Sequence, residues 1–491
     1  MSHFDSDVRT LVAVKIVHGS WRREDPYKIH IDDACDRWPN VESITAYLPD
    51  PFGTHHSKMF ILFMHDEQAQ IVIHTANMLA KDWTNMTQAV WRSPLLPKVE
   101  GQVHRLTGPV GSGFRFKQDL TSYLKAYGAK TKALVKQLQE FDFRHVRGAL
   151  VASVPSRTKY SHEERPNSKD LWGYPSLRRV LHAVSNRVLD GHQESNQSPH
   201  IVCQVSSIAT LPITWLDTFK DTLFCPDQGS WAHASIIYPT ASNVRQSLDG
   251  YAAGASIHTK AQKATHLKQI SSLRKQLCQW TRGPVVEARA RRELAAPHIK
   301  TYIRFRSTPT EQDPAPDIDW ALLTSANLST QAWGTAPKAS KGSQAKGEMN
   351  VHIQSYEIGV LVWPELYVNQ FGDEYRDEDL KLEIGHDGKR NEKEKSLSSP
   401  IRVRMVPVFG RDTPESPPGR PESPPADESN EVGISQPRPP QKGACTLLVG
   451  LRMPYDLPLT PYAAQELPWS PQSAYDIPDR HGRRWPPDET W

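Results

Sequence analysis

The chain has 491 residues and a formal net charge of +4; 38% of its residues are hydrophobic and 40 are prolines. Its length allows two to four domains, and its low apolar content predicts that one segment is disordered. An apolar run of the roughly 18 residues that a membrane span needs is not found, and the five cysteines have no zinc-binding spacing. We therefore expect reduced thiols in an intracellular protein without a membrane span or a signal peptide.

Short apolar segments in the first 143 residues predict strands, and a longer periodic segment predicts helix. The expected strands are residues 11–17, 43–48, 59–63 and 70–77. Apolar residues recur at helical spacing over 116–141, with a break at Gly128. Strands that alternate with helices predict an α/β fold with a mixed or parallel sheet.

The rest of the chain repeats this alternation. The expected strands are 148–154, 201–205, 234–239, 301–303, 320–327 and 356–363, and the expected helices are 215–224 and 263–281. Residues 384–443 are charged at first and then rich in proline, serine and glutamate, a composition that cannot bury enough apolar surface to fold. We expect a disordered insertion there, with its proline-rich part between the segments 401–408 and 446–451, within a second domain that covers residues 144–491.

A set of polar residues occurs twice in the same order. Each copy has His-x-Lys before an apolar segment, then an Asn in Ala-Asn, then a Trp six residues after that Asn: His56, Lys58, Asn77 and Trp83 in the first copy, and His298, Lys300, Asn327 and Trp333 in the second. This repetition predicts a duplicated α/β unit, with domains 1–143 and 144–491 sharing one site.

Two histidines, two lysines and two amides in one site suit a phosphoryl centre. One imidazole can act as nucleophile and the other as acid and base, while the lysines and amides stabilise charge on the phosphoryl oxygens. A cluster of carboxylates for Mg²⁺ is not present nearby in the sequence. We expect neutral Gln88 behind His56 and Glu357 behind His298, an asymmetry that assigns His56 as nucleophile and His298 as general acid.

Several motifs resemble one family. Paired His-x-Lys motifs mark the phospholipase D superfamily, but Phe63 and Phe305 stand where its common form has Asp. An Asn further along the chain, in (Thr/Ser)-Ala-Asn, resembles the motif of the tyrosyl-DNA phosphodiesterase family. The chain is similar to a fungal type of this family with a short N-terminus. The other matching stretches are 52–59, 72–77, 297–302, 324–329, 355–360 and 454–458.

The resemblance implies two similar α/β/α sandwich domains related by a pseudo-twofold axis. It also implies a nuclear, monomeric DNA-repair hydrolase without cofactor or metal, which removes topoisomerase I-derived tyrosyl peptides and other 3′ adducts from single- and double-stranded DNA. In this family pattern, Gln88 and Glu357 orient the histidines, and His56 forms a phosphohistidine that water cleaves with the help of His298. The residues that the resemblance places in substrate binding are Phe52, Ser206, Ser207 and Ser329.

The two halves differ at their beginnings. The first half has no expected counterparts of the strands 148–154 and 201–205, which suggests a missing part of its sheet. One alternative is therefore a protein that binds DNA ends but is catalytically impaired. A second alternative is another nuclease or lipase of the superfamily, which Phe63 and Phe305 disfavour.

Overall fold

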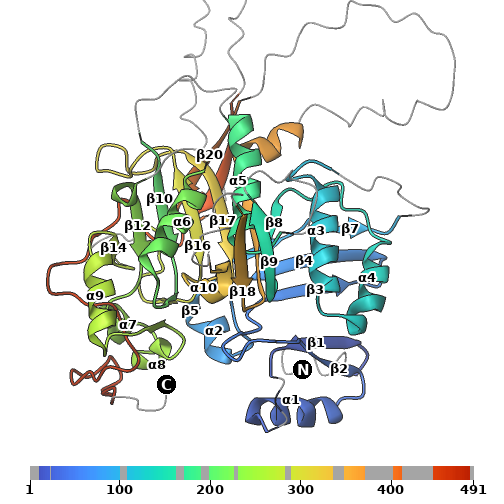
Figure 1. The fold of residues 1–491 in the computed structure, drawn as a ribbon, viewed down its shortest axis with the longest axis horizontal. Helices are drawn as coiled ribbons and strands as arrows, with labels where there is room; N and C mark the ends of the chain where they lie inside the picture. Colours follow the sequence, from blue (N-terminus) through green and yellow to red (C-terminus); the bar gives the residue numbers. More distant parts are fainter. Residues whose placement is uncertain are drawn as a thin grey trace, which may run out of the picture.

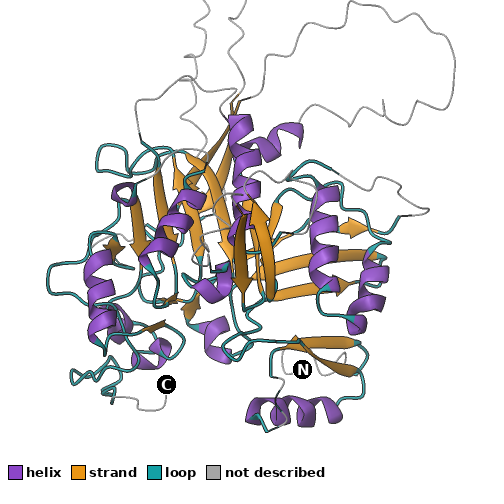
Figure 2. Ribbon diagram, viewed as in Figure 1, coloured by secondary structure: helices purple, strands orange, loops and turns teal. Residues whose placement is uncertain are grey.

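The structure is a computed structural model, and two β-sheets flanked by helices dominate it (Figure 1). It describes residues 10–20, 22, 24–99, 108–161, 171–188, 198–225, 230–281, 289–335, 348–370, 402–411 and 446–486. The strands of both sheets lie inside and the helices outside (Figure 2), which confirms the predicted α/β class. In the part of the chain described, no helix is both long enough and apolar enough to cross a bilayer.

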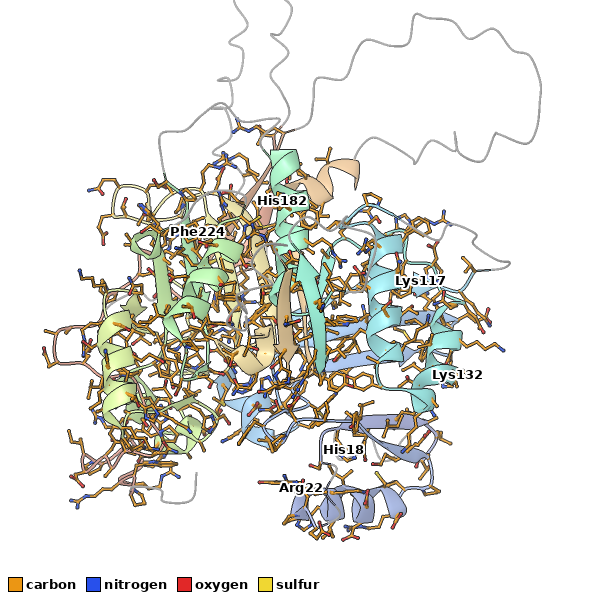
Figure 3. All side chains as sticks on the ribbon, viewed as in Figure 1. His18, Arg22, Lys117, Lys132, His182 and Phe224 are labelled. Carbon is orange, nitrogen blue, oxygen red and sulfur yellow. The ribbon has the colours of Figure 1, made fainter. Side chains whose placement is uncertain are left out.

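The smaller sheet is built from the first half of the chain. Its strands are β3 (Met59–Phe63), β4 (Gln68–His74), β6 (Val90–Arg92) and β7 (Leu96–Pro97), in the order β3-β4-β6 with β7 also on β4. Helices α3 (Gly113–Lys125) and α4 (Lys132–Leu138) cover it, joined by a 3₁₀ turn. Gly128 breaks the helix as predicted, because its φ of 85° suits glycine. Figure 3 shows Lys117 and Lys132 on this helical layer.

The larger sheet has nine strands in the order β14-β12-β10-β16-β17-β19-β8, with β20 on β17 and β21 on β20. Their bounds are β8 Ala149–Ser153, β10 His200–Gln204, β12 Ala234–Ile237, β14 Leu277–Cys278, β16 Thr301–Phe305, β17 Ile318–Thr324, β19 Glu357–Val362, β20 Arg402–Val408 and β21 Thr446–Arg452. The helices around it are α5 Tyr174–Val188, α6 Ile213–Leu223, α7 Ala241–Gln246, α8 Tyr251–Gly254, α9 Ala264–Leu273 and α10 Thr330–Trp333.

Smaller elements connect these layers. The short strand pairs are β9 (Ser156–Ser161) with β18 (Glu348–Ile353), β11 (Ser207–Ile208) with β13 (His258–Thr259), and β5 (Met86–Thr87) with β15 (Ala296–Pro297). The pair β5–β15 joins the two halves of the chain, and helix α2 (Ala80–Thr84) precedes β5.

The N-terminal strands form a separate unit. β1 (Val14–His18) pairs in parallel with β2 (Val41–Thr45), and α1 (Pro26–Asp36) connects them at the lower edge of Figure 1. In the larger sheet, β16 has β10 on one side and β17 on the other. Within the described residues, β3 pairs with β4 only and has no strand on its other side. In the same part of the chain, β6 has no neighbour that corresponds to β8. These are the positions that counterparts of β10 and β8 would occupy in the smaller sheet.

Two predicted elements are wrong in extent. The helix expected over 263–281 ends at Leu273, because Leu277 and Cys278 extend the sheet beside Ile236 and Ile237. The insertion expected over 384–443 contains strand β20, whose alternating buried residues Val403 and Met405 pair with β21. Residues 384–401 and 412–443 of that insertion lie outside the described residues.

One apolar cluster joins the two sheets. It combines Ile71 and Ile73 of β4 and Leu120 of α3 with Leu150 of β8 and Ile358 of β19. Burial of apolar surface therefore fixes β4 beside the ends of β17 and β19. This contact sets the positions of the repeated polar residues.

Candidate active site

Each of the two His-x-Lys motifs makes a backbone hydrogen bond to a segment of the other half of the chain. The His56 amide donates to the Tyr356 carbonyl at 3.0 Å, and the His298 amide donates to the Thr87 carbonyl at 3.1 Å. Each histidine is therefore fixed beside the segment that carries the polar partner in the opposite half. Gly53 permits one of these approaches, since a Cβ there would lie 2.3 Å from the Gln354 carbonyl oxygen.

This exchange reverses the expected pairing of histidines and polar partners. His56 Nδ1 lies 2.9 Å from Glu357 Oε2, and Gln88 Nε2 lies 3.4 Å from His298 Nδ1. The prediction that Gln88 stands behind His56 and Glu357 behind His298 is wrong. The order of residues along the chain suggested that each histidine has its polar partner in its own half. The backbone hydrogen bonds instead place each partner beside the histidine of the other half.

Glu357 is held as a buried carboxylate. Its side chain also accepts a hydrogen bond from Ser325 Oγ at 2.5 Å. Burial raises the pKa of Glu357, but His56, Lys58 and the Ser325 bond together keep that pKa below its usual value. Burial lowers the pKa of His56, and Glu357 only partly opposes this shift. A neutral His56 that donates from Nδ1 to Glu357 has its lone pair on Nε2.

The two lysines occupy equivalent places beneath the histidines. Lys58 Nζ donates to the carbonyl of His56 and Lys300 Nζ to that of His298, at 2.5 Å in each case. Both are buried. Burial lowers the pKa of Lys58 to about 8 and that of Lys300 well below its usual value, while Glu357 opposes both shifts. An anion that enters the site brings a negative charge close to both amines and thereby favours their charged forms.

Loss of the Lys58 charge should limit activity at alkaline pH. A lysine is charged below its pKa, so kcat/KM for an anionic DNA substrate should fall as pH rises above about 8. Rates measured from pH 6 to 10 test this, with the melting temperature followed over the same range to show that the fold persists. A rate that stays constant to pH 10 would contradict it.

The asparagines are fixed by different contacts in the two halves. The Asn327 side-chain oxygen accepts from the amides of Ser206 and Ser207, at 3.0 and 2.9 Å. Its NH₂ group is thereby left to donate to a substrate. Asn77 Nδ2 lies 3.4 Å from His298 Nε2, which places this amide at the ring nitrogen that faces away from Gln88.

The residues expected to bind substrate differ in their burial and in their contacts. Ser206 and Ser207 hold Asn327 through their backbone amides, and Ser206 is buried. The Ser329 hydroxyl caps helix α10 by accepting from the Ala332 amide at 3.2 Å. Phe52 is exposed in the loop between β2 and β3.

The repeated tryptophans hold the loops that carry the asparagines. Trp83 Nε1 donates to the Asn77 carbonyl at 2.8 Å, and Trp333 Nε1 donates to the Asn327 carbonyl at 3.0 Å. Trp333 is 1% exposed and packs against Phe219, whereas Trp83 is 46% exposed. The tryptophan of each copy therefore supports the backbone of the loop that carries the asparagine.

The different burial of the two tryptophans predicts unequal losses of stability when each is replaced by alanine. Trp333→Ala should lower the free energy of unfolding by about 3–5 kcal/mol because it empties a buried site. The matched Trp83→Ala change should cost less than about 2 kcal/mol, since much of that ring is already in water. Urea denaturation of both variants compares the costs, and equal costs would contradict the different packing.

One residue of the site was not identified from the sequence. Asp82 is fully buried in α2, and its Oδ2 lies 3.3 Å from His298 Nδ1 while accepting from the Asn77 amide at 2.7 Å. The corresponding residue of the second half is Ala332, so comparison of the repeats could have singled out Asp82. Over the described ranges, three or more His, Cys, Asp or Glu residues are nowhere grouped to hold a metal ion.

Comparisons with known proteins point to one family. The family model described as tyrosyl-DNA phosphodiesterase matches residues 1–463. A protein named probable tyrosyl-DNA phosphodiesterase from Schizosaccharomyces pombe is 28% identical, over 99% of this chain and 87% of that protein. Tyrosyl-DNA phosphodiesterase 1 from Drosophila melanogaster is 32% identical, over 67% of this chain and 53% of that protein.

Solved structures share the fold. The yeast tyrosyl-DNA phosphodiesterase crystal structure superposes with a TM-score of 0.54 and 19% sequence identity, over 93% of this chain and 87% of that one. The chain therefore belongs to the tyrosyl-DNA phosphodiesterase family of the phospholipase D superfamily, enzymes of DNA repair that hydrolyse tyrosyl adducts from DNA 3′ ends.

Proposed function

We propose that this chain performs this repair reaction through a phosphohistidine on His56 and leaves a DNA 3′-phosphate. The contact between His56 Nδ1 and Glu357 carries the proposal. It places the lone pair on Nε2, away from Glu357, and the carboxylate stabilises the positive charge that the imidazole gains when it is phosphorylated. The role of His56 therefore rests on a charged partner rather than on the neutral partner expected from the sequence.

In the first step, His56 Nε2 attacks the 3′ phosphorus. The N–P bond forms while the bond between phosphorus and the tyrosyl oxygen breaks, and His298 transfers its Nε2 proton to that oxygen. Lys58, Lys300 and the amides of Asn77 and Asn327 stabilise the negative charge on the phosphoryl oxygens.

In the second step, the roles of the two sides change. His298, now neutral, takes a proton from water at Nε2. The water oxygen bonds to phosphorus, the N–P bond to His56 breaks, and the 3′-phosphate leaves. The two lysines supply the positive charge that metal ions supply in other phosphoryl-transfer sites, so we expect no metal requirement.

The substrate is DNA with a 3′ adduct, foremost a tyrosyl peptide from trapped topoisomerase I, in single- or double-stranded form. The halves 1–143 and 144–491 share the site, and a monomer is sufficient for catalysis. Phe52, Ser207 and Ser329 are proposed to contact DNA or peptide beside it. Repair of DNA ends further implies action in the nucleus.

Incubation with an oligonucleotide that carries a 3′-phosphotyrosyl group, in the presence of EDTA, tests this function. The expected product is an oligonucleotide with a 3′-phosphate end. A chain that binds the oligonucleotide but leaves the adduct intact, while a control enzyme of the family cleaves it, would instead be a DNA-end-binding protein. A parallel assay with phospholipid tests for lipase activity, which we expect to be absent.

A further inference from the structure

Asp82 lies in the site but is not one of the residues that the two copies of the repeated motif share. Its carboxylate is fully buried, and Oδ2 approaches His298 Nδ1 at 3.3 Å. The other oxygen, Oδ1, has no hydrogen-bond partner within the described parts of the chain. Burial of a carboxylate without compensating contacts costs free energy. A carboxylate that is buried beside a histidine of the site therefore points to a role there.

Gln88 does not fill that role. Its Oε1 accepts from Thr75 Oγ1 at 2.7 Å, and its Nε2 donates to the Asp82 carbonyl at 3.1 Å. The atom that Gln88 turns toward His298 Nδ1 is therefore a donor. A donor cannot accept the Nδ1 proton, which the imidazolium carries while Nε2 serves as the acid.

The surroundings of His298 work against its charged form. Burial lowers its pKa well below the usual value, and Lys300, Lys58 and His56 lower it further, while the Thr75 carbonyl raises it. A general acid must hold a proton before it can transfer one. The bound phosphodiester brings one negative charge toward this site, and a carboxylate on the opposite side of the ring brings another.

We infer that Asp82 is the positioning residue of His298: its carboxylate accepts the Nδ1 proton, orients Nε2 toward the leaving oxygen and stabilises the imidazolium. This inference rests on the proposed function. It gives each histidine its own carboxylate, Glu357 for the nucleophile and Asp82 for the acid. Asp82 also accepts from the Asn77 amide, so a purely structural role must be separated from this one by experiment.

The test is Asp82→Asn, assayed in single turnover on two oligonucleotides. One carries a 3′-phosphotyrosyl group, whose leaving oxygen needs a proton, and the other a 3′-(4-nitrophenyl) phosphate, which leaves without one. We expect formation of the covalent intermediate to slow by about 10- to 100-fold on the tyrosyl substrate and much less on the nitrophenyl substrate. The ratio of the two rates does not depend on the fraction of folded protein.

Two variants serve as controls. Glu357→Gln should slow both substrates alike, because it acts on the nucleophile, and Asp217→Asn, an exposed carboxylate on α6, should change neither. Equal losses on both substrates would overturn the inference. A wild type that cleaves neither substrate contradicts the proposed function and this inference with it.

Discussion

His56→Asn is expected to abolish cleavage of the 3′-phosphotyrosyl oligonucleotide, with a rate loss of at least about 10⁴-fold. The change removes the Nε2 lone pair that attacks phosphorus, and the remaining groups do not supply another nucleophile at that place. An asparagine NH₂ group can still donate to Glu357, so the buried carboxylate keeps a partner. Single-turnover assays on denaturing gels measure the loss.

The control for this variant is the affinity for DNA. Asn77, Asn327 and both lysines stay in place, so binding of the uncleaved oligonucleotide and the melting temperature should both stay close to those of the wild type. Retention of more than a few per cent of the wild-type rate would show that His56 is not the nucleophile.

His298→Ala is expected to accumulate DNA joined covalently to the protein. The second step needs a base that takes a proton from water, and the variant lacks it, so the phosphohistidine should outlive its formation. The effect should be largest with the 3′-(4-nitrophenyl) substrate, because its leaving group departs without an acid. A band of protein joined to labelled oligonucleotide on a denaturing gel measures the intermediate.

The matched comparison is the double variant His56→Asn, His298→Ala, in which the band should disappear. A band that persists in the double variant would place the covalent bond on another residue. Absence of a band in His298→Ala, while the nitrophenyl group is released, would show that water is activated by some other group.

The repeat made much of the site predictable from the sequence. His56, Lys58 and Asn77 stand before or after strands whose apolar residues identify them, and the second copy lies in the same order. A pattern that occurs twice distinguishes functional polar residues from ordinary strand polarity. Strands β8, β10, β12, β16, β17 and β19 of the larger sheet were recognised because buried strands are short apolar runs.

The pairing across the halves was not predictable in this way. The positions of Glu357 and Gln88 beside the histidines depend on backbone hydrogen bonds at Tyr356 and Thr87, which leave no mark in composition or periodicity. Asp82 was not predicted because the repeat identifies residues common to both copies, and Ala332 stands at the corresponding position of the second copy. Helix α5 and the pair β9–β18 were not predicted either, although the buried residues Leu177, Val180, Leu181 and Val184 recur in α5 at helical spacing.

The measurement that most directly tests the division of roles between the two histidines is peptide mapping of the covalent intermediate. The His298→Ala protein is quenched after reaction with the nitrophenyl substrate, digested, and analysed by mass spectrometry under conditions that preserve phosphohistidine. We predict that the nucleotide is attached through its 3′-phosphate to His56. Attachment to any other residue would contradict the proposed mechanism.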